Sequence, residues 1–526
     1  MGQASPGLAH WLAEQDAPPL AEGSIGDLMR RNAVVRGDRP AVFFQSPDGA
    51  VARLSHSEFL EVSERMARWL LDQVRPGDRI AVWSTNCLDY AVLLKASALA
   101  GTIIVPFNIG WADGEVSHAL ALTGPALLVV GKDMRGSSVW PRAEALATCP
   151  IVDLDGLLAM APSDPARVLP DVAQGDPYLI QFTSGTTGRS KGALLSHHAA
   201  VTGGQLVMGA GAPGEADVWL IPVPPHHIAG SCSIPLAALA SGGAYVVVER
   251  FSTDGMIALM PKVGATRMGG VPTMWHDLLR HPDFPEDVKI DVLTLGGTKV
   301  PPALAREVEE RLGATISISY GQSECGAITG TRADDDLETK AETVGPPFPQ
   351  CAVKIIDPAT GETLRAGEVG ELCTISPATM IGYWANPEAT AGAFTADGYL
   401  RTGDLASMDA RGVCRIRGRT GEMIIRGGEN IYPIEIEEAL LTHPAVARAG
   451  VIGMPDDRLG QKVAAAVELV AGAAASIDAL RDHAAGQVAH FKVPVEWRIV
   501  ATLPMTASGK VRKVELPGLF ERETQA

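Results

Sequence analysis

Hydrophobic and polar positions alternate between helical and extended patterns along the first third of the chain. Ser55 and Glu58 form a capping box, and the apolar residues that follow them recur at helical spacing, which predicts a helix. Short apolar runs between polar segments indicate buried strands. These predicted strands are 79–84, 102–107, 126–130, 178–183, 244–249 and 291–295, and a further helix is predicted at 88–100. Apolar strands that alternate with helices are typical of parallel sheets covered on both faces.

The pattern changes twice in the remainder of the chain. From 344 to 419 the helical periodicity fades, and short strands between Gly and Pro turns predict a barrel-like β unit. After the glycine-containing segment 418–421, helical and extended patterns are mixed again. This last part should contain helices at 434–441 and 477–488 and a strand at 464–469.

These changes of pattern define the domain organisation that we expect. Residues 1–420 should form a large N-terminal α/β domain of helix-covered sheets, with the β-barrel-like subdomain at its end. Residues 421–526 should form a small, mobile α+β domain at the C-terminus. At about 150 residues per domain, a chain of 526 residues should hold about three domain-sized units.

Composition and charge exclude several classes of protein. Apolar types make up 46% of the residues, which excludes a disordered chain. No apolar run reaches the ~18 residues needed to cross a bilayer, and the N-terminus lacks the pattern of a secretory signal. The 61 acidic and 44 basic residues give a net charge of −17, which repels nucleic acid and anionic lipid. We therefore expect a cytoplasmic protein with no membrane span and no nucleic-acid partner.

The strongest local signal is the segment TSGTTGRSKG at 183–192. It follows an apolar strand and precedes 193–198, from which a helix can start. Its hydroxyl groups, its glycine N–H groups and Lys191 could cradle phosphate oxygens. A Walker A pattern cannot be fitted to it. An exposed polar loop is the alternative interpretation, but the density of hydrogen-bond donors favours a phosphate site.

With its flanking residues, this segment resembles the phosphate-loop signature of the adenylate-forming superfamily. That superfamily comprises acyl- and aryl-CoA synthetases, stand-alone adenylation domains and beetle luciferase. The other signatures follow in the expected order between about residue 25 and residue 515. They are PHHIAG at 225–230, YGQSE at 320–324, YLRTGD at 399–404, GR at 418–419, GGENIYP at 427–433 and TASGK at 506–510. Seven ordered matches leave no room for accidental similarity.

The resemblance implies an ATP-dependent acid:CoA ligase that works in two steps. A carboxylate is already ionised at pH 7, so its attack on the α-phosphate of ATP requires no general base. Positioning and electrostatic stabilisation are then sufficient to form the acyl-adenylate and release pyrophosphate. The thiol of CoA attacks the mixed anhydride in the second step. The expected ligands are ATP, Mg²⁺, CoA and a small-molecule carboxylic acid.

The same resemblance assigns catalytic and nucleotide-binding roles to individual residues. Glu324 would hold Mg²⁺, Asp404 would accept hydrogen bonds from the ribose, and Lys510 would bridge the substrate carboxylate and the α-phosphate. The catalytic residues would be Lys510, Glu324, His227, Thr183 and Lys191. The ATP- and AMP-binding residues would be Thr183, Ser184, Gly185, Thr186, Thr187, Gly188, Lys191, Gly296, Gly297, Thr298, Tyr320, Gly321, Gln322, Ser323, Asp404, Arg419 and Lys510.

By the same resemblance, the acid pocket and the CoA tunnel are formed by small and apolar segments. The pocket residues would be His226, His227, Ser231, Gly269, Gly270, Val271, Gly321 and Gly326, and the CoA-binding residues Gly427, Gly428 and Glu429. The adjacent His226 and His227 have no further ligand at zinc spacing, so a zinc site is rejected. Arg267 is the only basic residue near the pocket segments, which favours a bulky or extended apolar acid over a dicarboxylic acid.

One position departs from the family pattern and bears on domain movement. Gly421 stands where the family usually has an Asp or Lys hinge between the two domains. Glycine tolerates a wide range of backbone conformations, so rotation remains possible there.

Three other functions share most of the motifs. A stand-alone adenylation enzyme would load the acid onto a carrier protein, and a luciferase-type oxygenase would emit light. A non-catalytic nucleotide sensor would be expected to have lost Lys510 or Glu324, and both are present. The sequence leaves both a monomer and a homodimer open.

Overall fold

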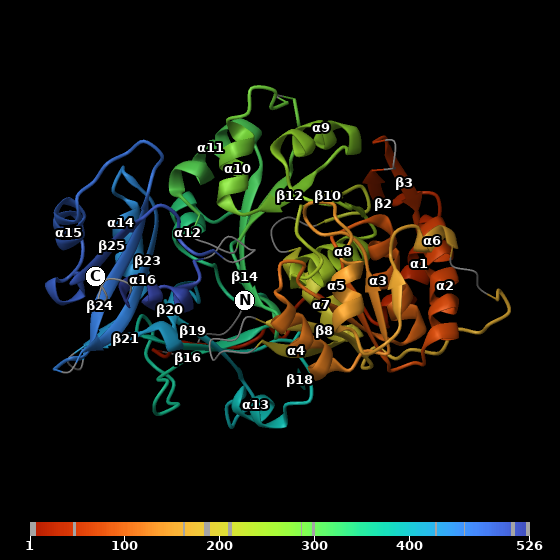
Figure 1. Cartoon of the computed structure of the whole chain (residues 1–526), viewed down its shortest axis with the longest axis horizontal. Helices are drawn as coiled ribbons and strands as arrows, with labels where there is room; N and C mark the ends of the chain where they lie inside the picture. Colours follow the sequence, from red (N-terminus) through yellow and green to blue (C-terminus); the bar gives the residue numbers. More distant parts are fainter. Residues whose placement is uncertain are drawn as a thin grey trace.

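The chain folds into stacked sheets and helices followed by a smaller C-terminal unit, as Figure 1 shows. The structure is a computed structural model that describes residues 7–45, 49–160, 164–183, 190–208, 213–285, 287–296, 300–426, 429–456, 458–505 and 511–521. In this part of the chain the strands form four sheets. The predicted α/β fold, with a large N-terminal domain and a smaller C-terminal domain, is confirmed.

The first large sheet carries the predicted strands of the N-terminal third. Its order is β18-β9-β8-β5-β4-β6-β7, with β4 to β8 parallel and both β9 and β18 antiparallel to their neighbours. The strands are β4 (Arg79–Trp83), β5 (Ile103–Pro106), β6 (Leu127–Val130), β7 (Ile151–Asp153), β8 (Pro177–Thr183), β9 (Lys191–Ser196) and β18 (Gly382–Tyr383).

The segment after the phosphate loop contains the helix start predicted within 193–198, preceded by a strand that was not predicted. Residues 191–196 form β9, which pairs antiparallel with β8. Leu195 and Ala193 are buried in this strand. The helix α7 (His197–Val207) begins only after Ser196, whose hydroxyl caps it by accepting from the Ala199 N–H. The residues on either side of the loop, Thr183 and Lys191, therefore lie opposite each other in paired strands.

The second large sheet is also mainly parallel. Its order is β15-β14-β13-β12-β10-β11-β2-β3, with antiparallel strands at both edges. The strands are β2 (Pro40–Gln45), β3 (Val51–Ser55), β10 (Val218–Leu220), β11 (Ala244–Val246), β12 (Arg267–Gly270), β13 (Val292–Leu295), β14 (Thr315–Gln322) and β15 (Gly326–Gly330). The strand predicted at 244–249 thus ends three residues earlier.

Helices cover both faces of each large sheet, as the alternating pattern predicted. One layer lies between the sheets, since α3 packs on β5 and α7 on β8, while α2 packs on β2 and α8 on β10 and β11. The helices of the first 420 residues are α1 (Ile25–Arg36), α2 (His56–Gln73), α3 (Leu88–Ala100), α4 (Asp113–Thr123), α5 (Trp140–Leu146), α6 (Leu157–Met160), α7, α8 (Ile234–Ser241), α9 (Thr253–Val263), α10 (Pro272–Leu279), α11 (Pro302–Leu312), α12 (Leu337–Glu342) and α13 (Pro387–Gly392). The capping box of Ser55 and Glu58 is present at the start of α2.

The segment predicted as a β unit forms an antiparallel sheet. Its order is β1-β16-β17-β19-β20. The strands are β1 (His10–Trp11), β16 (Ala352–Ile356), β17 (Val369–Ile375), β19 (Leu400–Met408) and β20 (Cys414–Arg419). This sheet lies between the large sheets and the C-terminal unit in Figure 1, so β19 and β20 lead directly into the last part of the chain.

The C-terminal unit has a sheet and hydrophobic cores of its own. The sheet has the order β22-β21-β24-β23, and β25 pairs with β24. Its two apolar clusters consist only of residues from Ile424 onward. The elements are β21 (Ile424–Arg426), β22 (Glu429–Ile431), α14 (Pro433–Leu441), β23 (Val446–Asp456), β24 (Gly460–Leu469), α15 (Ile477–Ala485), β25 (Glu496–Val500) and α16 (Pro517–Glu521). Helix α15 ends before the predicted 488, at Gly486, a residue that disfavours helix.

Within the described ranges, no helix is long and apolar enough to cross a membrane.

Candidate functional site

Asp404 lies at the centre of a cluster of the predicted nucleotide-binding residues. The register of β19 and β20 places it opposite Arg419, whose Nε lies 2.9 Å from Asp404 Oδ1. The hydroxyl of Tyr320 and the side-chain amide of Gln322 each donate to Asp404 Oδ2 at 2.6 Å. Both donors come from β14, so two sheets meet at this carboxylate.

The charges of this cluster stabilise one another. Burial raises the pKa of Tyr320, and the neighbouring Asp404 raises it further, so the phenol stays protonated and remains a donor. Burial disfavours the charge of Arg419, but Asp404, Tyr320 and Glu422 together outweigh burial and raise the pKa of the guanidinium. Asp404 is only 6% exposed, and its Oδ1 still has a free lone pair beside Arg419. The carboxylate can therefore accept a hydrogen bond from a sugar hydroxyl.

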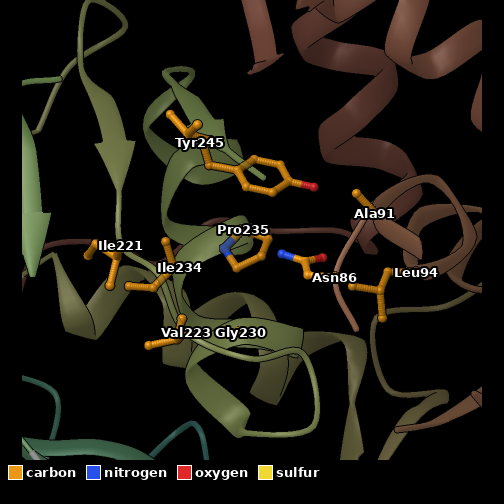
Figure 2. Close-up of a pocket in the computed structure, with 10 residues that line it drawn as sticks. Asn86, Ala91, Leu94, Ile221, Val223, Gly230, Ile234, Pro235 and Tyr245 are labelled. Carbon is orange, nitrogen blue, oxygen red and sulfur yellow. The ribbon is translucent and has the colours of Figure 1, made fainter. Parts of the chain in front are cut away.

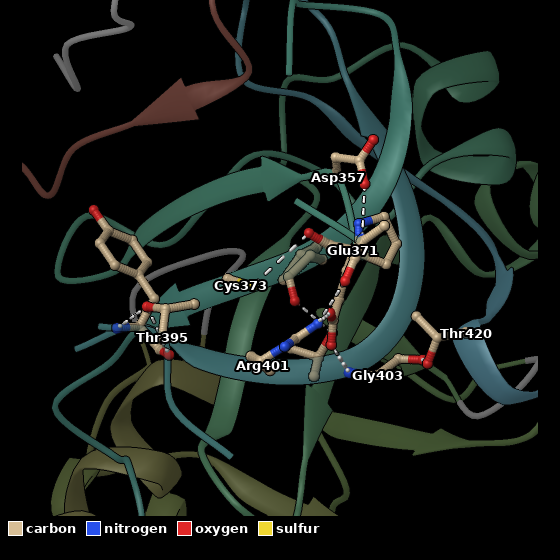
Figure 3. A network of polar contacts seen from close by, with 12 residues as sticks. Asp357, Glu371, Cys373, Thr395, Arg401, Gly403 and Thr420 are labelled. Carbon is tan, nitrogen blue, oxygen red and sulfur yellow. Dashed lines mark hydrogen bonds and ion pairs between the residues drawn. The ribbon is translucent and has the colours of Figure 1, made fainter. Parts of the chain in front are cut away.

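A buried carboxylate that the sequence did not indicate positions Asp404. Glu371 on β17 is 3% exposed and accepts from Arg401 Nε at 2.9 Å and from Arg401 Nη2 at 2.5 Å (Figure 3). Its other oxygen accepts the N–H of Gly403 at 3.1 Å. Gly403 has φ +70°, a conformation that favours glycine, and directly precedes Asp404. Glu371 thus fixes the backbone of β19 at Gly403, directly before Asp404.

Tyr383 joins two predicted phosphate and metal residues. Its hydroxyl donates to Glu324 Oε1 at 2.9 Å, and Lys191 Nζ lies 4.9 Å from the centre of its ring. The pairing of β18 with β9 brings these groups together, because Tyr383 lies opposite Ala193, two residues along the strand from Lys191. Burial raises the pKa of Tyr383, and Glu324 raises it further, so the phenol remains a donor. No spacing in the sequence pointed to Tyr383.

The residues around Glu324 fit the binding of a magnesium ion together with nucleotide phosphates. Tyr383 engages only Oε1, so Oε2 has no hydrogen-bond partner among the described residues. Mg²⁺ at nucleotide sites is typically bound by one or two carboxylates, with phosphate oxygens and water completing the shell. A single oriented carboxylate near a lysine is therefore the donor set that such an ion requires.

The His226–Ser231 segment is held in place from within the core. Ser231 is fully buried and donates from its hydroxyl to Gln181 Oε1 at 2.9 Å, while Gln181 Nε2 donates to the His226 carbonyl at 2.6 Å. Ser231 belongs to η1 (Ala229–Ser233), a π-helical turn of the kind found at functional sites. Burial, with a smaller contribution from His227, lowers the pKa of His226 to about 4. The exposed His227 is thus the member of the pair that can face a ligand.

The glycines predicted for the acid pocket serve different purposes. A Cβ on Gly321 would lie 2.1 Å from the Gly326 carbonyl oxygen, so this glycine allows the close hairpin of β14 and β15. Gly326 has φ +60°, and Gly270, which directly precedes Val271, has φ +149°. A Cβ on Gly269 would lie 2.6 Å from the Thr294 carbonyl oxygen and 3.1 Å from Ile221 Cδ1, so this glycine allows close approach to β13 and lies beside Ile221.

A small cavity, whose surface is polar and apolar in about equal parts, lies beside the His226–Ser231 segment. Figure 2 shows its walls, which come from α3, η1, α8 and the ends of β10 and β11. The lining residues are Asn86, Ala91, Leu94, Ile221, Val223, Gly230, Ile234, Pro235, Tyr245 and Val246. Arg267, the one basic residue near the predicted pocket, does not face this space as a free charge. It is 4% exposed and pairs with Asp217 at 2.8 Å.

The structure describes only some of the remaining predicted residues. Gly296 follows β13 with its N–H 3.4 Å from the Gly270 carbonyl oxygen, Ser323 lies in the turn between β14 and β15, and Gly421 lies in η2 (Thr420–Glu422). Glu429 is exposed on β22. Outside the described residues lie Ser184, Gly185, Thr186, Thr187, Gly188, Gly297, Thr298, Gly427, Gly428 and Lys510.

Two family models match the chain in sequence. The model of AMP-binding enzymes matches residues 29–384, and the model of the AMP-binding enzyme C-terminal domain matches residues 435–510. The Bacillus subtilis protein YngI, whose acyl-CoA synthetase name is provisional, is 33% identical over 94% of this chain and 97% of its own length. A mitochondrial medium-chain acyl-CoA ligase of Bos taurus is 32% identical over 89% of this chain and 83% of its own length.

Solved structures of CoA ligases have the same fold. ATP-bound MatB from Rhodopseudomonas palustris is 28% identical and superposes with a TM-score of 0.83, whereas apo MatB gives 0.73; both cover 94% of this chain and 99% of theirs. o-Succinylbenzoate CoA synthetase from Bacillus subtilis, 28% identical, gives 0.83 with its acyl-adenylate intermediate and 0.82 with ATP and magnesium ion. These cover 94% and 93% of this chain and 98% and 99% of theirs.

The motif order, the Asp404 cluster and these matches agree with one another. The chain belongs to the AMP-binding enzyme family of adenylate-forming enzymes and is one of its acyl-CoA synthetases.

Proposed function

We propose that the protein activates an extended or bulky apolar carboxylic acid as its acyl-adenylate and then transfers the acyl group to CoA. ATP, Mg²⁺ and CoA would be its other ligands. The observation that carries this proposal is the Asp404 cluster. Three donors from two strands orient one buried carboxylate, and Oδ1 keeps acceptor capacity beside the Arg419 guanidinium. This is an arrangement suited to a ribose with a phosphate next to it.

The phosphates would lie along the line from Arg419 to Lys191. Lys191 and Thr183 stand at the two ends of the loop that should cradle the β- and γ-phosphates. When bound at Glu324, Mg²⁺ would neutralise charge on the departing pyrophosphate. Lys510, from the C-terminal part, would hold the acid carboxylate next to the α-phosphate. These groups position and screen two anions, and adenylate formation needs no proton transfer; in the second step the CoA thiol loses its proton and AMP leaves.

The arrangement of the two domains supports a state competent for adenylate formation. ATP-bound and apo MatB share one sequence, yet the ATP-bound form superposes on this chain with a TM-score of 0.83 and the apo form with 0.73. The adenylate complex of o-succinylbenzoate CoA synthetase also reaches 0.83. We infer that the described arrangement corresponds to the nucleotide-bound state. Transfer to CoA would then follow a rotation of the small domain about Gly421.

The apolar acid is inferred from the side chains around the His226–Ser231 segment. Most residues that line the small cavity beside it are apolar in type, and Ile221 lies beside Gly269. Arg267 is paired with Asp217 and its guanidinium lies 5.1 Å from the ring centre of Trp219, so it offers no free charge to a second carboxylate. A monocarboxylic acid with an apolar tail therefore fits better than a dicarboxylic acid. The similarity to medium-chain acyl-CoA ligases supports the same class.

A pyrophosphate-release assay with a panel of acids tests this function. Medium-chain and aryl monocarboxylic acids should support ATP-dependent release, and short dicarboxylic acids should not. Ile221→Phe should shift the optimum toward shorter acids, because the larger ring narrows the space beside Gly269. Thioester should form when CoA is added. Release without thioester formation, together with loading of a phosphopantetheinylated carrier protein, would contradict the CoA step.

A further inference from the structure

The segment that joins the two domains is bound on both sides of Gly421. It comprises Arg419, at the end of β20, and η2, which covers Thr420–Glu422. Thr420 is linked to the large domain and Glu422 to the small domain through separate hydrogen-bonded networks. Gly421 lies between these two points and carries no side chain.

The link to the large domain runs through Gly403. The hydroxyl of Thr420 donates to the Gly403 carbonyl at 3.1 Å, and the Gly403 N–H donates to the buried Glu371 at 3.1 Å (Figure 3). Glu371 in turn binds Arg401 through two hydrogen bonds. Arg419 is held by Asp404 at the same end of β19. The chain is therefore fixed to the large domain up to Thr420.

The link to the small domain runs through Lys513. Its Nζ lies 2.8 Å from Glu422 Oε2 and 2.8 Å from Glu437 Oε1. Glu437, on α14, also accepts the N–H of Val451 on β23 at 2.8 Å. Burial disfavours the charge of Lys513, but Glu437 and Glu422 outweigh it and raise its pKa, so the ammonium stays charged at neutral pH. Helix α14, strand β23 and the η4 segment (Lys513–Glu515) are thus joined to Glu422.

We propose that Thr420 and Lys513 are positioning residues that confine the domain rotation to Gly421. The proposal rests on the two-step function above. Held at Thr420 and Glu422, the segment can turn about the backbone of Gly421 without disturbing either anchor. The Met423 N–H bonds to the Arg419 carbonyl across this point at 3.2 Å, and a single such bond costs only about 1 kcal/mol to break. The anchors would give the small domain two defined orientations instead of a broad range.

Removing an anchor should widen the range of domain orientations, and this can be measured without substrate. Spin labels at exposed Val34 and Leu441 report the distance between the domains, in a background where the two cysteines that are not buried, Cys87 and Cys149, are serine. Thr420→Val and Lys513→Met should broaden the distance distribution. Thr420→Ser and Lys513→Arg keep the hydroxyl and the charge and should leave it narrow.

Lys462→Met is the matched control in the small domain. Lys462 pairs with Glu496 at 2.6 Å, with side-chain exposure similar to that of Lys513 and Glu422. Its loss should leave the distance distribution unchanged. Broadening that is equal in Lys462→Met and Lys513→Met would mean that general loosening of the small domain is being measured, and it would overturn the proposal.

A rescue experiment separates the anchors from ordinary structural contacts. Gly421→Pro should slow acyl transfer from preformed acyl-adenylate to CoA by about 10-fold or more, because proline fixes φ. Adding Thr420→Val or Lys513→Met to Gly421→Pro should raise the rate of acyl transfer again, because rotation can then occur about neighbouring bonds. On a logarithmic scale, the second substitution should recover about a third or more of the rate that Gly421→Pro removed. Lys462→Met should restore none. If the second substitutions do not restore the rate and the distance distributions stay unchanged, the positioning role of Thr420 and Lys513 is refuted. If the wild-type chain releases no pyrophosphate with any acid, only the proposed function is refuted.

Discussion

Tyr383 donates a hydrogen bond of 2.9 Å to Glu324, and its ring provides the surface over which Lys191 lies. The three residues come from β18, the turn after β14 and the start of β9, so they meet only when two sheets are assembled. A single aromatic side chain thereby positions both the expected metal ligand and the expected phosphate-binding lysine. This contact leads to the first prediction.

Tyr383→Phe should raise the Mg²⁺ concentration needed for half-maximal pyrophosphate release by about 10-fold, because a hydrogen bond to a charged group contributes roughly 1.5–3 kcal/mol. The KM for ATP should change little, since the ring beneath Lys191 remains. Tyr383→Leu also removes the ring and should raise the KM for ATP as well. Glu324→Gln, which removes the charge at nearly constant volume, should reduce the rate more than either. Identical Mg²⁺ titrations for wild type and Tyr383→Phe would remove Tyr383 from the site.

Lys510→Ala should lower the rate of adenylate formation by orders of magnitude. It should leave the rate of thioester formation from supplied acyl-adenylate largely unchanged. The reason is that this lysine is expected to stabilise charge only in the first half-reaction. The two half-reactions are measured separately, by pyrophosphate release and by thioester formation. Equal loss in both would assign Lys510 a structural role.

Glu371→Gln should weaken nucleotide binding although Glu371 touches no predicted ligand position. The substitution removes the charge that Arg401 balances and weakens the hydrogen bond to the Gly403 N–H, so the backbone of β19 before Asp404 becomes less defined. We expect the KM for ATP to rise about 5- to 10-fold, with a smaller change in kcat at saturating ATP. Glu362→Gln, at an exposed turn, is the control. A variant that loses kcat at unchanged KM would contradict the positioning of Asp404 by Glu371.

Lys95→Met should stabilise the protein at neutral pH. Lys95 is 1% exposed on α3, its Nζ has no hydrogen-bond partner among the described residues, and burial lowers its pKa to about 8. Between pH 8 and about 10.4, the unfolded chain holds a proton on this lysine that the folded chain lacks. The free energy of unfolding therefore falls as the pH falls through this window, by roughly 3 kcal/mol in all.

Denaturant unfolding at pH 7 and at pH 10 measures this effect. The gain from Lys95→Met should be largest at pH 7 and should shrink at pH 10, where the penalty in the wild type is nearly gone. Lys289→Met, at an exposed position, is the control and should change little at either pH. A gain of the same size at both pH values would show that packing, and not the buried charge, determines the change.

Several elements could be predicted from the sequence because their causes are local. Helix α3 spans the predicted Leu88–Ala100, since a long apolar run ends at Gly101, which adopts the left-handed conformation of a C-cap. The helix predicted to start within 193–198 does start there, at His197, but the strand before it was missed because a short apolar run suits a strand and a helix start equally well. Pairing with β8 decided the outcome, and that pairing depends on the partner strand.

By itself the sequence determined the α/β class, the order of the motifs and the residues Tyr320, Gln322, Asp404 and Arg419, which the structure brings into one cluster. Only the tertiary structure decided how these groups are held. Glu371, Tyr383 and Lys513 act on partners far away along the chain, and the pairing of β17 with β19, of β18 with β9 and the packing of η4 on α14 bring them into contact. A motif records which groups lie on one short stretch of backbone. Strand register and packing determine which distant polar atoms meet, because a buried donor or acceptor must find its partner wherever the fold places one.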